Sequence, residues 1–176
     1  MLEIFRAYTD IALLRRGPES LPYSVPLLVI TIVLVLSLAF IAPTVPGWSL
    51  TAVMLVNMTE VLMITSIVWL LLNAISRTER CVQTLTAIFG ARFVLSLLQI
   101  AVQVVGGFED SLAAQSMTPA FAMTLLLEFW FYVVWSRALR ASLGITLLQS
   151  IAVIVLTTVL MLGLLSLILP GVGVAV

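Results

Sequence analysis

The chain has 176 residues, of which 62% are apolar, 9% are charged and none is histidine, and its mean hydropathy is +1.26. This composition lies outside the range of soluble globular domains and indicates a membrane protein. Eight basic residues, all arginine, balance eight acidic ones, so the sequence predicts no nucleic-acid partner. The lack of histidine excludes serine–histidine and cysteine–histidine catalytic pairs and histidine-ligated metals or haem.

The first segment, residues 2–16, has the apolar periodicity of an amphipathic helix. Its apolar face comprises Ile4, Phe5, Tyr8, Ile11 and Ala12, opposite Glu3, Arg6, Asp10 and Arg16. We expect this helix to lie in the cytoplasmic interface of the membrane, before a proline-containing extended link that completes a region of residues 1–24. It would be either a docking surface for a cytosolic partner or anionic lipid, or a helix that only rests on the bilayer.

Five further stretches are long and apolar enough to cross a hydrocarbon core of about 30 Å as helices. They are Val25 to Ala42, Leu50 to Leu72, Thr84 to Val105, Pro119 to Leu139 and Leu143 to Leu169. None shows the alternation of apolar and polar residues that barrel strands require. The sequence therefore predicts an all-α fold: an integral membrane five-helix bundle over residues 25–169, preceded by the short interfacial amphipathic helix and followed by a short tail at 170–176.

All the arginines except the mid-span Arg92 indicate the orientation. They precede the first span (Arg6, Arg15, Arg16), join the second to the third (Arg77, Arg80) and join the fourth to the fifth (Arg137, Arg140). Because basic residues are retained on the cytoplasmic side, we expect a cytoplasmic N-terminus and a C-terminus outside. The absence of lysine is typical of arginine-favouring, GC-rich bacterial genomes, so the expected location is the bacterial inner membrane.

Three ionisable residues, Glu60, Arg92 and Glu128, fall near the middle of the second, third and fourth spans. A charge at that depth costs about 2.5–3.5 kcal/mol on insertion scales, so such residues normally face the interior of a bundle and find partners there. Polar residues recur beside them at helical spacings. The predicted intramembrane polar cluster comprises Glu60, Arg92, Glu128, Asn57, Gln99 and Gln103.

The simplest arrangement places the Arg92 guanidinium between the carboxylates of Glu60 and Glu128, one of whose charges then remains in surplus. Either one glutamate is protonated, or the surplus charge faces water or a partner's cation. The cluster would form a proton or substrate path, or an interhelical clamp that fixes the register of the helices. A shallower Arg92 that snorkels to the cytoplasmic face is the remaining alternative.

Two stretches have a distinctive sequence: residues 81–91 (CVQTLTAIFGA), which enter the third predicted span, and residues 135–145 (WSRALRASLGI), which link the fourth to the fifth. With the order of the spans, they resemble the Yip-domain family, the Rab-GTPase-interacting membrane proteins of eukaryotes and their prokaryotic relatives. The resemblance covers about residues 5–169 and implies five clustered spans, a cytoplasmic N-terminus and a non-enzymatic role as a membrane organiser. Eukaryotic members carry an Asp-Leu-Tyr-Gly-Pro-like motif before the first span, whereas Gly17-Pro18 here follows Leu14-Arg15-Arg16. This difference argues against Rab-type GTPase binding.

The sequence has no Walker loop, GxGxxG, CxxC or GxSxG motif, so we expect no catalytic residue, metal site or cofactor. The first interpretation is a non-enzymatic scaffold or accessory subunit that contacts a protein partner, or itself, within the lipid bilayer. Its cytoplasmic contact candidates are Phe5, Arg6, Tyr8, Arg15, Arg16, Arg137 and Arg140. The alternative is a small proton-coupled carrier or channel that uses the three mid-membrane charges.

Overall fold

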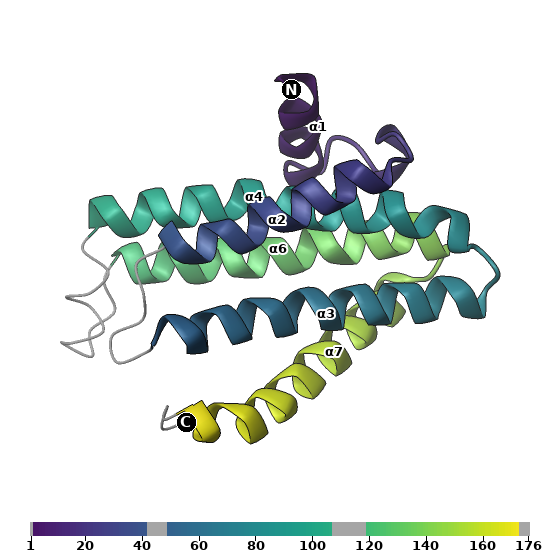
Figure 1. The fold of residues 1–176 in the computed structure, drawn as a ribbon. Helices are drawn as coiled ribbons and strands as arrows, with labels where there is room; N and C mark the ends of the chain where they lie inside the picture. The colour runs from purple at the N-terminus through teal and green to yellow at the C-terminus, as the bar shows by residue number, and fades with distance from the viewer. Residues whose placement is uncertain (1, 42–48, 107–118, 173–176) are drawn as a thin grey trace.

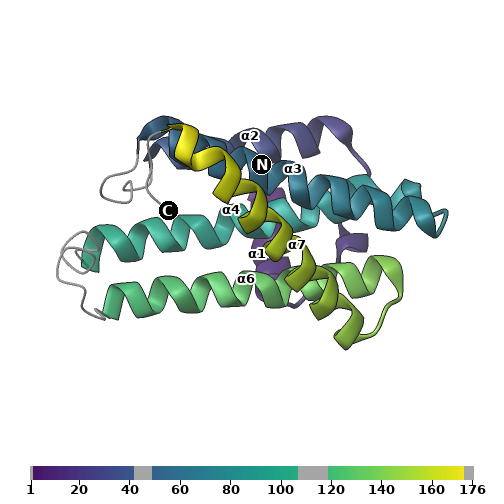
Figure 2. The same ribbon diagram turned by 90° about the horizontal axis from the view of Figure 1, so that it is seen from below.

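The computed structural model describes residues 2–41, 49–106 and 119–172, and within these ranges every regular element is a helix. The helices are α1 (Leu2–Ala12), α2 (Val25–Ile41), α3 (Leu50–Ala74), α4 (Cys81–Gly106), α6 (Pro119–Leu143) and α7 (Leu147–Ile168). Single 3-10 turns occupy Pro18–Ser20, Thr78–Arg80 and Leu169–Val172. Helices α2, α3, α4 and α6 run along one another, while α7 crosses them obliquely (Figures 1 and 2). The predicted all-α membrane helix bundle is confirmed.

Four helices are long and apolar enough to cross a membrane: α3, α4 with the turn before it, α6 and α7. The first predicted span, α2, is also apolar but shorter, with 17 described residues or about 25 Å of helix. Its predicted end at Ala42 lies outside the described residues, as do residues 173–176 of the predicted tail. Within the described residues, the bundle therefore contains four full-length apolar helices and one shorter one.

The fourth span ends later, and the fifth begins later, than the sequence predicts. α6 ends where Gly144 adopts a φ of +72°, a left-handed conformation that favours glycine. α7 begins after Thr146, whose hydroxyl accepts from the Gln149 backbone N–H while the Gln149 side chain accepts from the Thr146 backbone N–H. Arg137 and Arg140 therefore lie on the last turns of α6 and not in a linker.

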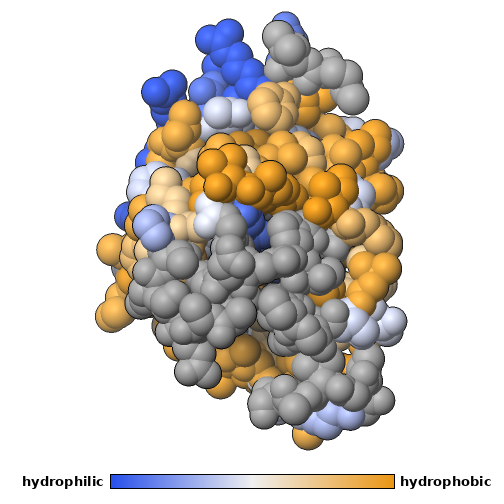
Figure 3. All heavy atoms as spheres, turned by 90° about the vertical axis from the view of Figure 1, so that its left-hand side faces the viewer, coloured by the Kyte–Doolittle hydropathy of each residue, from blue (hydrophilic) through white to orange (hydrophobic). Residues whose placement is uncertain are grey.

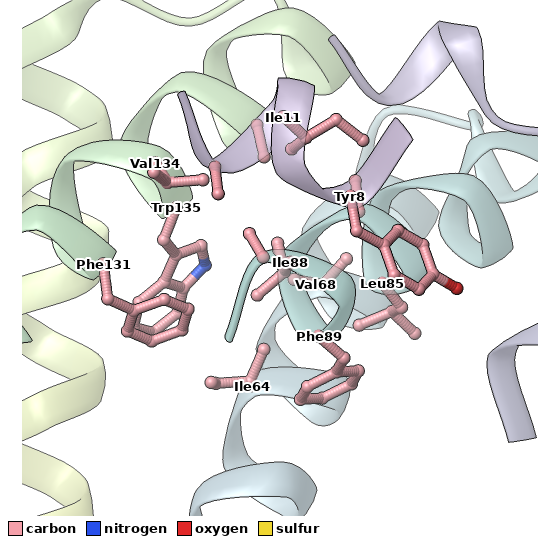
Figure 4. Packing of buried hydrophobic residues seen from close by; sticks show 14 of the residues in the cluster. Tyr8, Ile11, Ile64, Val68, Leu85, Ile88, Phe89, Phe131, Val134 and Trp135 are labelled. Carbon is pink, nitrogen blue, oxygen red and sulfur yellow. The ribbon is translucent and has the colours of Figure 1, made fainter. Parts of the chain in front are cut away.

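Helix α4 is the centre of the bundle: α6 and α2 pack along it and α1 packs across it. Large side chains from four helices meet around its first half (Figure 4). They are Tyr8 and Ile11 of α1, Ile64 and Val68 of α3, Leu85, Ile88 and Phe89 of α4, and Phe131, Val134 and Trp135 of α6. Because lipid tails are as apolar as these side chains, their close packing, rather than exclusion from water, holds the helices together.

In the described part of the chain, three pairs of buried hydroxyls join neighbouring helices. They are Tyr8 with Thr31 (α1 to α2, 2.6 Å), Thr84 with Ser142 (α4 to α6, 2.6 Å) and Ser136 with Ser150 (α6 to α7, 2.7 Å). Hydrogen bonds of this kind contribute about 0.6 kcal/mol each on average in a membrane protein. Their main effect is to fix the register of one helix against the next.

Helix α1 packs on protein, whereas the sequence predicted that it would lie on the membrane interface. It stands across the bundle beside α4 and α6 (Figure 1), and it ends at Ala12 instead of continuing to Arg16. Its buried face is formed by Ala7, Tyr8, Ile11 and Ala12. The indole N–H of Trp130 in α6 donates to the Ala12 carbonyl at 2.8 Å, which satisfies one of the open carbonyls at the end of α1. The apolar periodicity of residues 2–16 predicts that one face of the helix is covered. It does not distinguish cover by lipid from cover by protein.

The close approach of α1 to α4 depends on Gly90. A Cβ atom added at this position would overlap the ring of Tyr8. Small residues at helix contacts commonly allow backbones to approach in membrane proteins. Gly90 therefore provides the space into which the Tyr8 ring packs.

We expect Gly90→Ala to displace α1 and to lower the stability of the protein by about 1–3 kcal/mol, because the new methyl group overpacks the contact. Gly163→Ala in α7 is the matched control, since nothing lies within 4 Å of an added Cβ there. The control should leave stability unchanged or raise it slightly through helix propensity. Thermal unfolding in one detergent compares the two variants, and equal shifts in both would contradict this role of Gly90.

Candidate functional site: an intramembrane ion cluster

The structure brings Glu60, Arg92 and Glu128 together from three helices. Nη1 of Arg92 in α4 donates to Oε2 of Glu128 in α6 at 2.6 Å. Nη2 of the same side chain donates to Oε2 of Glu60 in α3 at 3.2 Å. One forked guanidinium thus ties three membrane-crossing helices, which is the arrangement that the mid-span positions predicted.

Two neighbours complete the cluster. The side-chain amide of Gln99, two helical turns beyond Arg92 on α4, donates to the same Oε2 atom of Glu128 at 3.0 Å. The Phe131 ring, one turn beyond Glu128 on α6, lies with its centroid 4.7 Å from Cζ of Arg92. Phe131 therefore adds a cation–π contact and covers one face of the guanidinium with an apolar group.

The three ionisable side chains are mostly enclosed, but not equally. The exposed fractions are 15% for Arg92, 17% for Glu60 and 32% for Glu128. Seen from the end of the bundle opposite the arginine-bearing turns, hydrophilic atoms are visible at its centre among apolar side chains (Figure 3). Because two carboxylates face one guanidinium, the cluster has one acid more than its cation balances. Glu128 is the carboxylate with the more open surroundings.

Asn57 and Gln103 do not join this group. The side chain of Asn57 donates to the Val53 carbonyl of its own helix at 2.9 Å, a local bond that short amides commonly make. Gln103 lies three turns beyond Arg92, half-buried, and the described residues offer its side chain no hydrogen bond. Four of the six predicted members therefore meet: Glu60, Arg92, Glu128 and Gln99.

All of the predicted contact candidates except Tyr8 are exposed. Phe5, Arg6, Arg15 and Arg16 are exposed, and Arg16 pairs with Asp10 at 3.1 Å. Arg137 and Arg140 are exposed on α6. These residues remain accessible to a partner.

Tyr8 was predicted to be a contact candidate for a partner, but the structure buries it. Its side chain is 3% exposed, and its hydroxyl pairs with Thr31 at 2.6 Å. Burial raises the pKa of its phenol, and the hydrogen bond with Thr31 opposes that rise. Tyr8 is therefore part of the contact between α1 and the bundle and cannot reach a partner.

Sequence reasoning missed three residues of the site and its surroundings. Phe131 could have been found, because it lies three residues after Glu128 and therefore on the same face of α6. Trp130 and Gly90 could not, since their contacts exist only because α1 packs on the bundle. Nothing in the local sequence of α4 or α6 indicates where an outlying helix will settle.

The Arg92 side chain links α4 to α3 and to α6. Arg92 holds both carboxylates through direct hydrogen bonds, so protonation or loss of either acid weakens a link between two helices. In the part of the chain that the structure describes, no three metal-binding side chains gather in one place. The cluster therefore offers ion pairing, and a carboxylate that could exchange a proton, as its chemistry.

We expect Arg92→Met to lower the stability of the protein by about 3–5 kcal/mol, because it leaves two carboxylates facing each other without a cation. The triple variant with Glu60→Gln and Glu128→Gln in addition removes every charge of the cluster and should recover most of the loss. Thermal unfolding of both variants in the same detergent measures the difference. A triple variant no more stable than Arg92→Met would show that the ionic balance is not what matters.

Comparison with known proteins adds no relative: no family model, no curated protein and no solved structure matches the chain. The resemblance to the Yip-domain family therefore stays a prediction. The chain is described by its own geometry, an all-α membrane helix bundle with an ion cluster at its centre.

Proposed function

We propose that the chain is a non-enzymatic subunit of a membrane complex, a scaffold or accessory component, which contacts its partner through the outward face of α1. The observation that supports this proposal is the position of α1, which stands halfway along the bundle (Figure 1) and has the exposed charged residues Glu3 and Arg6. The ion cluster then serves to fix the helices against which α1 packs.

The depth of α1 follows from its two contacts. Gly90, against which Tyr8 packs, lies nine residues after Cys81, about 14 Å along α4. Trp130, which bonds the end of α1, lies thirteen residues before Leu143, about 20 Å along α6. If the arginine-bearing end of the bundle marks one surface of a hydrocarbon core of about 30 Å, α1 meets the bundle near the middle of the bilayer.

Lipid is a poor neighbour for α1 at that depth. Glu3 and Arg6 are exposed on its outward face, and each charge would cost about 2.5–3.5 kcal/mol in the hydrocarbon on insertion scales. Hydrophilic residues gather at the top of Figure 3, where α1 stands in Figure 1, above a surface that is mainly apolar. A protein surface with polar groups of its own would cover this face without that cost.

The proposed orientation places the arginine-bearing end in the cytoplasm of a bacterial cell, with the bundle in the inner membrane. Its support is that the arginines of two separate segments lie at one end: Nη1 of Arg77, in the turn between α3 and α4, lies 3.9 Å from the ideal Cβ position of Gly144, just beyond α6. Arg137 and Arg140 are on the last turns of α6. Basic residues are retained on the cytoplasmic side of inner-membrane proteins. A non-enzymatic role also agrees with the resemblance to the Yip-domain family.

A photoreactive amino acid in place of Arg6 should crosslink to a defined protein in native membranes, because the proposal puts protein against this side chain. The same probe in place of Leu156, a 56% exposed residue halfway along α7, is the control and should react with lipid. Gel shifts followed by mass spectrometry identify the products. Crosslinking of position 6 to lipid alone, with a monomer as the only protein species, would contradict the proposal.

A proton-coupled carrier or channel is the second candidate, and one observation favours it. Glu128 is about one third exposed, and it shares a single arginine with Glu60. Such a carboxylate could take up and release a proton where water reaches it.

Proton uptake driven by a pH gradient into proteoliposomes tests the second candidate. If the protein is a carrier, Glu128→Gln should lose most of its proton flux while the variant stays folded, because an amide cannot titrate. Thr124→Val, one turn away on α6, is the control, since it removes only a bond of its hydroxyl to the Ala120 carbonyl. Wild-type protein without flux above empty liposomes would leave the subunit role as the account of the cluster.

A further inference from the structure

A groove with a volume of about 1050 Å³ opens between α6 and α7. Most of its wall is apolar and comes from these two helices, including Phe129, Val133, Ile151, Val155 and Val159. Two arginines, Arg137 and Arg140, line the same groove near the end of α6. It therefore combines a long apolar wall with positive charge at one end.

We propose that this groove binds one anionic phospholipid, whose acyl chain lies along α6 and α7 and whose phosphate contacts Arg137 and Arg140. The inference does not rest on the role proposed for α1, although Leu14, two residues after the end of α1, also lines the groove. Three observations support it: the length of the groove, the charges that line it and the state of its polar side chains.

The groove has the length of an acyl chain within one leaflet. From Arg137, its lining along α6 continues for eight positions to Phe129, about 12 Å of helix. One leaflet contributes about 15 Å, half of a hydrocarbon core of about 30 Å. A chain that fills the groove would therefore end near the bilayer midplane, with its headgroup at the level of the arginines.

The charges that line the groove fit a phosphate. Arg137 and Arg140 are exposed, and neither forms an ion pair with any residue that the structure describes. Among the residues that the structure describes, no carboxylate lines the groove, while Arg77 approaches its rim from the turn between α3 and α4, with Nη1 3.9 Å from the ideal Cβ position of Gly144. Forked guanidinium groups bind phosphate oxygens through paired hydrogen bonds. The end of the groove thus has two arginines in its lining and a third nearby.

The polar side chains farther along the groove already have partners. Tyr132 interacts with Thr158 across the gap between α6 and α7. The Thr158 hydroxyl also donates to the Ile154 carbonyl at 2.9 Å, and Ser136 pairs with Ser150 at 2.7 Å. An acyl chain against Ser136 and Thr158 would therefore leave neither hydroxyl without a partner. This end of the groove suits hydrocarbon better than a polar ligand.

Native mass spectrometry of the purified protein, equilibrated with equal amounts of phosphatidylglycerol and phosphatidylcholine of matched chains, measures the preference directly. The variant Arg137→Gln with Arg140→Gln removes both charges from the groove. Arg80→Gln is the matched control, because Arg80 is exposed at the same end of the bundle but does not line this groove. Val155→Trp, at an exposed position in the wall, fills the path of the chain. Thermal unfolding confirms that each variant is folded.

We expect wild-type protein and Arg80→Gln to retain phosphatidylglycerol preferentially. The double arginine variant should lose about 25-fold of that preference, at roughly fivefold for each arginine. Val155→Trp should retain less of both lipids. An unchanged preference in the double variant, an equal loss in Arg80→Gln, or unchanged retention in Val155→Trp would each overturn the proposal.

Discussion

The contact of one guanidinium with two carboxylates is the interaction on which the bundle depends. Arg92 is the point where α3, α4 and α6 meet through charge, and its partners are 2.6 and 3.2 Å away. In a medium of low dielectric, an ion that lost its partners would be more costly than in water. The three helices are therefore restricted to registers in which these side chains meet. Apolar packing alone imposes a weaker restriction, since many registers of leucine-rich helices pack almost equally well.

Helix α4 carries Arg92 and is also the helix on which α1, α2 and α6 pack. Its first half is nearly all buried, because α2 and α6 pack along it and α1 closes over Gly90. The same helix continues to Arg92 and Gln99, so the docking site of α1 and the ion cluster share one rigid element. The position of α1 is thus tied to the register that the charges select.

Much of the fold was accessible from the sequence, because each span must satisfy its backbone within a known thickness of hydrocarbon. The starts of α2, α3 and α6 agree with the predicted spans at Val25, Leu50 and Pro119. The turn between α6 and α7 was predicted less well. Apolar residues continue through it, and the signals that end one helix and begin the next are a single glycine conformation and a side-chain cap.

The part of the candidate site that follows from depth in the membrane and from helical spacing could be predicted from the sequence. Mid-span charges must find partners, which is why Glu60, Arg92 and Glu128 could be placed together, and helical spacing added Gln99. The same spacing added Asn57, whose amide donates to the Val53 carbonyl of its own helix, because periodicity assigns a face but does not tell whether an amide bonds its own backbone. The position of α1 and the groove between α6 and α7 depend on tertiary packing, so no segment of the sequence encodes them separately.

The most direct measurement of the central interaction is a solid-state NMR distance between the Arg92 guanidinium nitrogens and the glutamate carboxyl carbons, in protein labelled with ¹⁵N-arginine and ¹³C-glutamate in bilayers. Comparison of Glu60→Gln and Glu128→Gln assigns each contact. The structure predicts strong dipolar coupling from Arg92 to both carboxyl carbons, each lost in the corresponding variant. Coupling of Arg92 to neither glutamate would contradict the account that ion pairing sets the register of the bundle.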